Sequence, residues 1–96
     1  MTVQDAVSQH REEILRIAAQ HGATNVRVFG SVARGTAGSE SDLDLLIDVT
    51  GDTTPWFPGG LIADLEDLLG CHVDVATEDT LHRRIRDRVL VEARPL

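Results

Sequence analysis

Residues 26–47 have the sequence VRVFGSVARGTAGSESDLDLLI, and this stretch decides the fold. An apolar run rich in β-branched residues ends in the turn Gly30-Ser31, and ten residues later Asp42 and Asp44 open a second apolar run. Successive side chains of a strand point to opposite faces, so we expect both aspartates on one face of the second strand. Because the loop between the runs is short, the two strands are expected to be neighbours in one sheet.

The Asp42 and Asp44 side chains pose an electrostatic problem. Two carboxylates on an otherwise apolar strand repel each other and resist burial. At ~4 Å separation and an effective dielectric constant of about 20, the repulsion amounts to roughly 4 kcal/mol. A divalent cation between the carboxylates removes this cost, so the pattern predicts a metal site at the start of the second strand.

Asp74 lies in a third short apolar run, residues 72–76. Taken alone it is weak evidence, because one aspartate can also cap a turn or pair with an arginine. If this strand lies beside the second strand, three carboxylates converge on one point. Such oxygen-only sites suit Mg²⁺ or Mn²⁺ rather than zinc, and three aspartates can hold two ions about 3.5–4 Å apart, as in displacement at phosphorus.

The Gly30-Ser31 turn has two interpretations. Glycine lets the backbone approach a phosphate closely, and the N–H groups of Ser31 and its successors, with the serine hydroxyl, form an anion site at the start of a short helical segment. The simpler alternative is a serine that caps a helix after a strand. The Asp-x-Asp pair downstream favours the phosphate interpretation.

Composition narrows the classes of function. The 96 residues form one domain, residues 1–96, with 42% hydrophobic residues and a formal net charge of −7. All nine basic residues are arginine, which excludes lysine chemistry, and the acidic balance argues against non-specific nucleic-acid binding.

No basic-then-apolar signal pattern opens the chain and no apolar run approaches about 18 residues, so we expect a cytoplasmic protein without membrane association. Cys71 is the one cysteine, so no intramolecular disulfide is expected, and its apolar neighbours predict a buried, inert thiol.

The order of elements is predicted as α-β-β-α-β-α, in the α/β (α+β) class, with a small mixed sheet of about three strands flanked by helices. Leucine and valine spacing predicts the helices, and β-branched runs predict the strands. The predicted elements are a helix over 3–20, strands over 25–29, 42–49 and 72–76, a turn entering a short helical segment over 30–35, a helix over 61–69, and a last helix capped by Thr77 or Thr80.

Histidine and aromatic residues give weaker signals. The four histidines lack ligand-like spacing and are expected to be surface or packing residues; they are His10, His21, His72 and His82. Phe29 is expected in the core. Trp56, in the loop TGDTTPWFPGG, can stack on a nucleobase, line a partner surface or enter the core, and the sequence leaves these three open.

The combined motif resembles the signature of the polymerase-β-like nucleotidyltransferase superfamily. Residues 29–37 and 41–47 resemble its minimal nucleotidyltransferase (MNT) branch, as do Leu65–Gly70, Val73-Asp74-Val75 and Val91-Glu92-Ala93. The resemblance covers essentially the whole chain, with no departure at the catalytic positions.

The resemblance implies transfer of a nucleoside monophosphate from an NTP to an acceptor hydroxyl, with release of pyrophosphate. By analogy Asp42 and Asp44 would ligate two Mg²⁺ ions (or Mn²⁺), and Asp74 would ligate the catalytic ion and help activate the acceptor. Gly30 and Ser31 would bind the triphosphate. For Arg34 two roles stay open, a contact to phosphate and an ion pair with an acid.

Small MNT proteins resemble antitoxins that partner HEPN-domain ribonuclease toxins, which implies transfer of AMP from ATP to a toxin tyrosine. The chain has no second domain to present an acceptor, so a second copy or a separate toxin would complete the site. One alternative is a non-catalytic antitoxin whose acidic residues 40–79, with eleven acids and no Lys or Arg, mimic RNA phosphates. A third option is transfer to RNA or a small molecule.

Overall fold

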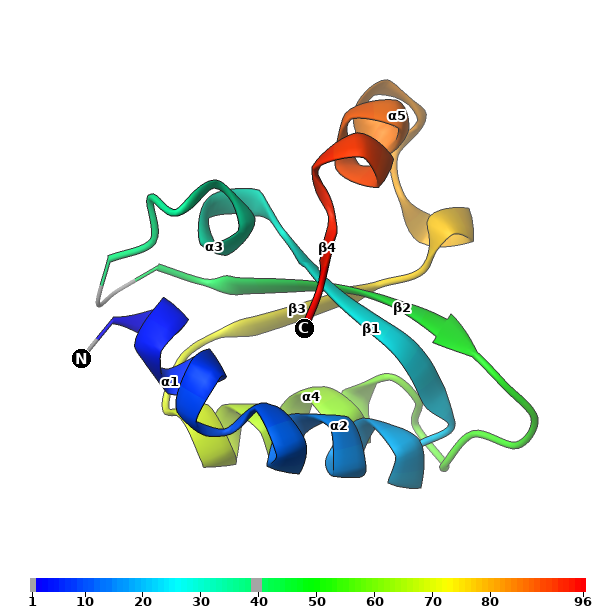
Figure 1. Cartoon of the computed structure of the whole chain (residues 1–96). Coiled ribbons are helices and arrows are strands. Elements are labelled where there is room, and N and C mark those ends of the chain that lie inside the picture. Colours follow the sequence, from blue (N-terminus) through cyan, green and yellow to red (C-terminus); the bar gives the residue numbers. More distant parts are fainter. Residues whose placement is uncertain (1, 39–40) are drawn as a thin grey trace.

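The computed structural model describes residues 2–38 and 41–96. In this part of the chain a four-stranded sheet carries helices on both faces (Figure 1). The helices are α1 (Val3–Gln9), α2 (Arg11–Gln20), α3 (Gly30–Arg34), α4 (Gly59–Leu69), the short 3₁₀ helix η1 (Glu78–Thr80) and α5 (Arg83–Glu92). The strands are β1 (Ala23–Phe29), β2 (Leu43–Val49), β3 (Val73–Ala76) and β4 (Arg94–Pro95).

The sheet has the strand order β3-β2-β1-β4 and is mixed. β1 runs antiparallel to both β2 and β4, whereas β2 and β3 run parallel because α4 carries the chain back between them. The predicted mixed α/β architecture and the adjacency of the first two strands are confirmed. The fourth strand is new: Arg94 and Pro95 pair with Val28 and Arg27.

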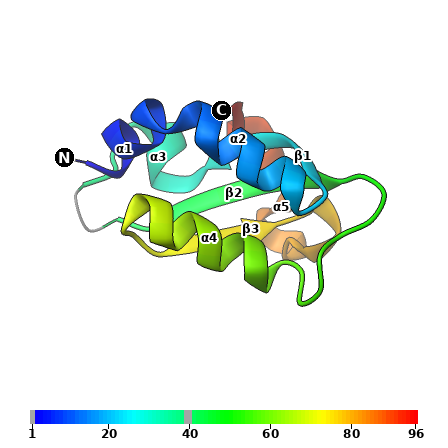
Figure 2. The same cartoon turned by 90° about the horizontal axis from the view of Figure 1, so that it is seen from below.

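Helices α1, α2 and α4 cover one face of the sheet (Figures 1 and 2). Leu43, Leu45 and Ile47 of β2 are buried on this face, where every second residue is apolar. They join one core cluster with residues from each helix of the layer and from the neighbouring strands, among them Val3, Val7, Ile14, Ala18, Val26, Val28, Leu61, Leu65 and Val73. The alternate residues of β2, including Asp44, therefore belong to the opposite face.

The predicted helix over residues 3–20 is two helices. α1 ends at Gln9 and α2 begins at Arg11, with His10 between them at φ −107° and ψ 19°. Residues 8–13 are all polar, so no apolar side chain anchors this stretch to the sheet. The break lets the buried residues of both helices pack on one core. Thr2 begins α1 with a capping box, in which its hydroxyl accepts from the Asp5 N–H.

Helix α5 lies on the opposite face of the sheet from α1, α2 and α4 (Figure 1). Thr77 caps η1 and not α5, while the His82 side chain begins α5 by accepting from the Arg84 N–H at 3.1 Å. Leu46 of β2 and Val89 of α5 are buried but lie outside the main core cluster. No helix among the described residues combines the length and apolar character that a membrane span requires.

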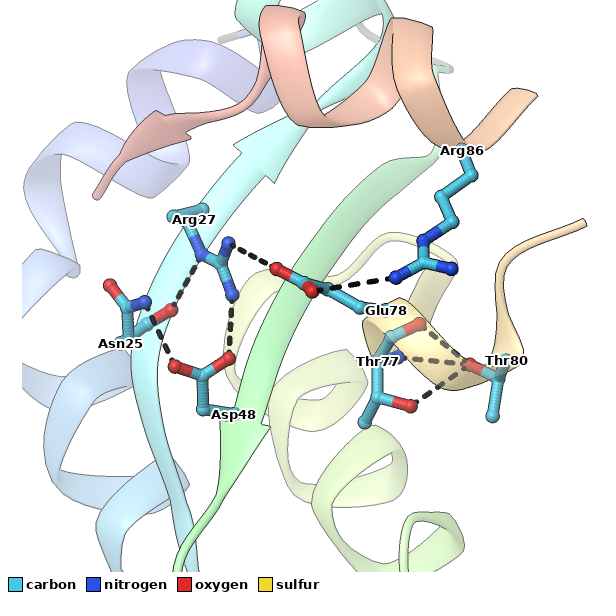
Figure 3. Close-up of polar contacts among 7 residues, drawn as sticks. All are labelled: Asn25, Arg27, Asp48, Thr77, Glu78, Thr80 and Arg86. Carbon is cyan, nitrogen blue, oxygen red and sulfur yellow. Dashed lines mark hydrogen bonds and ion pairs between the residues drawn. The ribbon is translucent and has the colours of Figure 1, made fainter. Parts of the chain in front are cut away.

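A polar network on this second face ties η1 and α5 to the strands (Figure 3). The Arg27 guanidinium donates to the Asn25 carbonyl at 3.0 Å and to Asp48 at 2.9 Å, and it lies 3.8 Å from Glu78. Glu78 also lies 3.9 Å from Arg86 of α5. The network occupies the end of the face near the end of β2, which leaves the start of β2 to the aspartates.

Candidate active site

Parallel pairing of β2 with β3 brings two of the predicted site residues side by side. Asp44 and Asp74 are register partners, flanked on both strands by the buried residues Leu43, Leu45 and Val73. Because the flanking residues face the core, both carboxylates project from the other face of the sheet. Asp42 precedes β2 by one residue and joins them, so three acids separated by up to 32 residues meet at one end of the strands.

The charges in this cluster oppose one another. The pKa of Asp44 is raised above its usual value, first by partial burial, then by the negative charges of Asp74 and Asp42 and by a hydrogen bond with Asp74. The positive charge of Arg34 partly offsets this effect. Ionised carboxylates packed this closely need a counter-charge, and a divalent cation with oxygen ligands supplies one. The residues present therefore fit the predicted metal.

Gly30 makes room for Asp44. It is the first residue of α3, with φ +71°, and its neighbour Phe29 pairs with Asp44 across β1 and β2. A Cβ atom at position 30 would overlap the Oδ2 atom of Asp44. The sequence predicted that Gly30 lets the backbone approach a phosphate. The structure adds a second reason for glycine here, because the Asp44 carboxylate needs the space that a Cβ atom would fill.

Ser31 is half-buried in the first turn of α3. The residue at the N-cap position is Phe29, which makes no side-chain cap hydrogen bond. The alternative that Ser31 caps the helix is therefore wrong. The Ser31 carbonyl accepts from the Thr36 N–H at 3.0 Å, which helps to fix the chain after α3.

Arg34 is paired with an acid. Its Nη1 lies 2.6 Å from Oε1 of Glu92, which is mostly buried at 16% exposure, and this contact joins α3 to α5. The sequence left two roles open for Arg34, a phosphate contact and an ion pair with an acid. The structure contains the ion pair. The arginine is still close enough to Asp44 to lower the pKa of that carboxyl.

His72 belongs to the cluster, which sequence reasoning missed. Three possible ligand atoms lie within 4.8 Å of one another, one from each of Asp42, His72 and Asp74. The histidine Nε2 is 3.4 Å from Asp74 Oδ1, and Nδ1 is 3.0 Å from Glu66 Oε2. A usable signal was present, because residues 72 and 74 alternate onto the same face of an extended chain.

Trp56 lies away from the aspartates. It is 90% exposed in the loop after β2, so the core placement is wrong. β2 has seven residues, so its two ends are about 20 Å apart, and the loop follows the end opposite Asp42 and Asp44 (Figure 1). The expected core placement of Phe29 is also wrong: the residue is half-buried, outside the main core cluster and on the aspartate face of the sheet.

Cys71 packs against the core as a half-buried residue. Burial raises the pKa of its thiol, and the negative charges of Asp42 and Glu66 raise it further. A thiol with a raised pKa is a poor nucleophile, which agrees with the expectation of an inert cysteine.

The sequence of this chain matches one protein family model and several curated proteins, and their descriptions agree. The family model described as "Nucleotidyltransferase domain" matches residues 7–96. The chain is 32% identical to "Putative protein adenylyltransferase MJ0435" of Methanocaldococcus jannaschii, over 91% of this chain and 94% of that protein. It is 31% identical to "Protein adenylyltransferase MntA" of Thermococcus cleftensis, over 94% of this chain and 88% of that protein.

Two solved structures share the fold. One is described as "Structure of putative minimal nucleotidyltransferase"; it is 46% identical, has a TM-score of 0.83, and the match covers 97% of this chain and 95% of that one. The other is described as "Crystal structure of the toxin-antitoxin with AMP-PNP". It is 17% identical with a TM-score of 0.73, covering 88% of this chain and 69% of that one, and it supports the fold alone.

Proposed function

The chain belongs to the nucleotidyltransferase domain family and is a nucleotidyltransferase, and on this basis we propose that it transfers AMP from ATP to a protein hydroxyl and thereby acts as an antitoxin. The observation that carries the proposal is the meeting of Asp42, Asp44 and Asp74 on the sheet face away from the main core. Relatives named as protein adenylyltransferases support a protein acceptor.

Three aspartates would hold the metal ions. Asp42 and Asp44 would ligate both ions, and Asp74 would ligate the catalytic ion. Mg²⁺ or Mn²⁺ would neutralise the charge that builds on the α-phosphate and on the leaving pyrophosphate. Gly30 keeps Asp44 in place, and its positive φ sets the direction of the turn into α3.

The reaction forms a bond between the acceptor oxygen and the α-phosphorus and breaks the bond from that phosphorus to the bridging oxygen of pyrophosphate. Asp74 would help to activate the acceptor by accepting the proton that leaves its hydroxyl. It is 60% exposed at the edge strand β3, so a protein side chain can reach it from solvent. No covalent enzyme intermediate is needed, because positioning and charge neutralisation account for the catalysis.

The turn at the start of α3 would hold the triphosphate. Ser31, in the first turn of α3, would donate from its hydroxyl and its backbone N–H. Arg34 would reach the same phosphates by exchanging its contact with Glu92 for one with ATP, and this exchange would alter the joint between α3 and α5.

The partner we propose is a HEPN-domain ribonuclease toxin, modified on a tyrosine. AMP adds negative charge and bulk, so attachment near a ribonuclease centre would oppose binding of substrate phosphate. The description of one fold neighbour as a toxin-antitoxin structure with AMP-PNP is consistent with this assembly. The competing hypothesis is that the chain neutralises the toxin by binding alone. Binding alone does not require carboxylates that repel one another around Asp44.

Mass spectrometry of the partner tests this proposal. A candidate HEPN-domain toxin is co-expressed with the wild type or with Asp74→Asn and purified, and its intact mass and modified residue are determined. We expect AMP on a tyrosine with the wild type and an unmodified toxin with the variant. An unmodified but fully neutralised toxin in both cases would establish the binding-only alternative.

A further inference from the structure

His72 stands between two carboxylates at the edge of the proposed metal centre. Its Nδ1 lies 3.0 Å from Glu66 Oε2, and its Nε2 lies 3.4 Å from Asp74 Oδ1. The side chain is 62% exposed, so an ion from solvent can reach the ring. Among the described residues this is the histidine that shares a ligand-sized cluster with two aspartates.

Glu66 fixes the orientation of the ring. Its Oε2 also accepts from the Val73 N–H at 2.9 Å, so the backbone at the start of β3 holds this carboxylate in place. The same Glu66 oxygen lies 3.0 Å from His72 Nδ1, so the backbone of β3 holds a carboxylate against one ring nitrogen. The other ring nitrogen, Nε2, is the one that faces Asp74.

His72 Nε2 and Asp74 Oδ1 lie 3.4 Å apart, close enough to bind one metal ion together. Histidine ligands of metal ions commonly have a carboxylate beside their other ring nitrogen, and Glu66 occupies that position beside His72 Nδ1. Asp42 completes the set, because its carboxylate oxygen, the His72 nitrogen and an Asp74 oxygen lie within 4.8 Å of one another.

We propose that His72 is a direct nitrogen ligand in the metal centre, together with Asp42 and Asp74. This inference rests on the proposed metal centre of the nucleotidyltransferase and adds a metal preference to it. Imidazole nitrogen favours transition ions such as Co²⁺ over Mg²⁺, which prefers oxygen ligands. The centre therefore selects a transition ion more strongly than three aspartates alone would.

Metal titration of the full chain tests the inference. Isothermal calorimetry with Co²⁺ and Mg²⁺ separately is applied to the wild type, His72→Gln and the control His10→Gln. His10 is a suitable control because it also lies beside a glutamate, with Nδ1 3.3 Å from Glu13 Oε1, but at the junction of α1 and α2. We expect His72→Gln to weaken Co²⁺ binding at least about tenfold and Mg²⁺ binding less than about threefold, and His10→Gln to change neither.

The visible absorption of the Co²⁺-loaded protein gives a second readout, since its bands respond to replacement of a nitrogen ligand by oxygen. We expect the spectrum to shift in His72→Gln and to stay unchanged in His10→Gln. Unchanged Co²⁺ affinity and spectrum in His72→Gln would overturn the proposal, and so would an equal loss of affinity for both ions.

Asp42→Asn separates this inference from the proposed function. If Asp42→Asn loses both ions while His72→Gln keeps both, the metal centre stands and His72 is not a ligand. If Asp42→Asn keeps both ions with wild-type affinity, the metal centre itself is wrong, and the assignment of His72 falls with it.

Discussion

The Asp44 carboxylate fills the space in which a side chain at position 30 would lie. A Cβ atom on Gly30 would overlap Asp44 Oδ2. β1 and β2 create this contact, because Phe29 pairs with Asp44 and the chain turns into α3 at the next residue. The glycine of the motif is thus coupled sterically to its second aspartate. The turn at Gly30 and the Asp44 carboxylate therefore form one structural unit.

Gly30→Ala is expected to reduce AMP transfer about 10²-fold, because displacement of a catalytic group by about 1 Å has effects of that size. Its φ of +71° adds a stability cost of roughly 1–2 kcal/mol. Gly35→Ala is the matched control, since Gly35 has φ +74° and no atom within 4 Å of an added Cβ. It should lose similar stability in urea unfolding and keep its activity. Equal losses of activity in both variants would show that backbone strain, not Asp44, is responsible.

Asp44→Asn is expected to stabilise the metal-free protein. The pKa of Asp44 is raised in the folded state, so its ionised form opposes folding at pH values above that raised pKa. The cost falls as pH drops through the folded pKa and vanishes below the unfolded value of about 4. At pH 7 the variant should gain no more than about 1 kcal/mol, because Asp44 is partly exposed and solvent screens its charge.

Urea unfolding at pH 7 and pH 4 in the presence of a chelator measures this effect. The gain from Asp44→Asn should shrink at the lower pH. Added Mg²⁺ should raise the stability of the wild type more than that of the variant, since an ion that binds the folded state stabilises it. A variant less stable than the wild type at pH 7 without metal would contradict the electrostatic account.

The Arg34–Glu92 pair offers a test of the phosphate role. Arg34→Ala removes the contact and Glu92→Gln removes its negative charge, and an ion pair with one half-exposed partner contributes only about 0–1 kcal/mol to stability. If Arg34 binds ATP, Arg34→Ala raises KM for ATP roughly tenfold or more, whereas Glu92→Gln frees the arginine and leaves KM unchanged or lower. Steady-state transfer kinetics with varied ATP distinguish them. Equal KM values for both variants and the wild type would leave Arg34 with the structural role alone.

Trp56 should not report on the nucleotide. It is the sole tryptophan, it is 90% exposed, and it follows the end of β2 opposite the aspartates. Intrinsic fluorescence excited at tryptophan wavelengths is therefore expected to stay within a few per cent on addition of ATP and Mg²⁺ at concentrations that saturate the enzyme. A strong quench that Asp42→Asn abolishes would mean that the base reaches Trp56.

Local sequence patterns predicted the part of the fold that governs the site. Period-two alternation around Asp42 and Asp44 identified β2 and its two faces, and the apolar run around Asp74 identified β3. The sequence did not predict that β3 lies beside β2; it left this pairing as a condition for the three carboxylates to meet. Parallel pairing depends on the crossover through α4 and not on any local signal.

Other features depend on tertiary contacts that a linear pattern does not carry. β4 is two residues long and contains a proline, which is tolerated at a sheet edge but gives no periodic signal. The contacts of His72 depend on Glu66, which reaches it from α4. The steric demand of Asp44 on Gly30 appears only once β1 and β2 are paired.

Label transfer tests the central claim most directly. The wild type and the double variant Asp42→Asn/Asp44→Asn are incubated with Mg²⁺, the partner toxin, and ATP labelled on either the α- or the γ-phosphorus. The account predicts that α-label attaches to the toxin, that γ-label does not, and that the double variant, folded by circular dichroism, loses at least about 10³-fold in rate. Undiminished attachment of α-label by the double variant would contradict it.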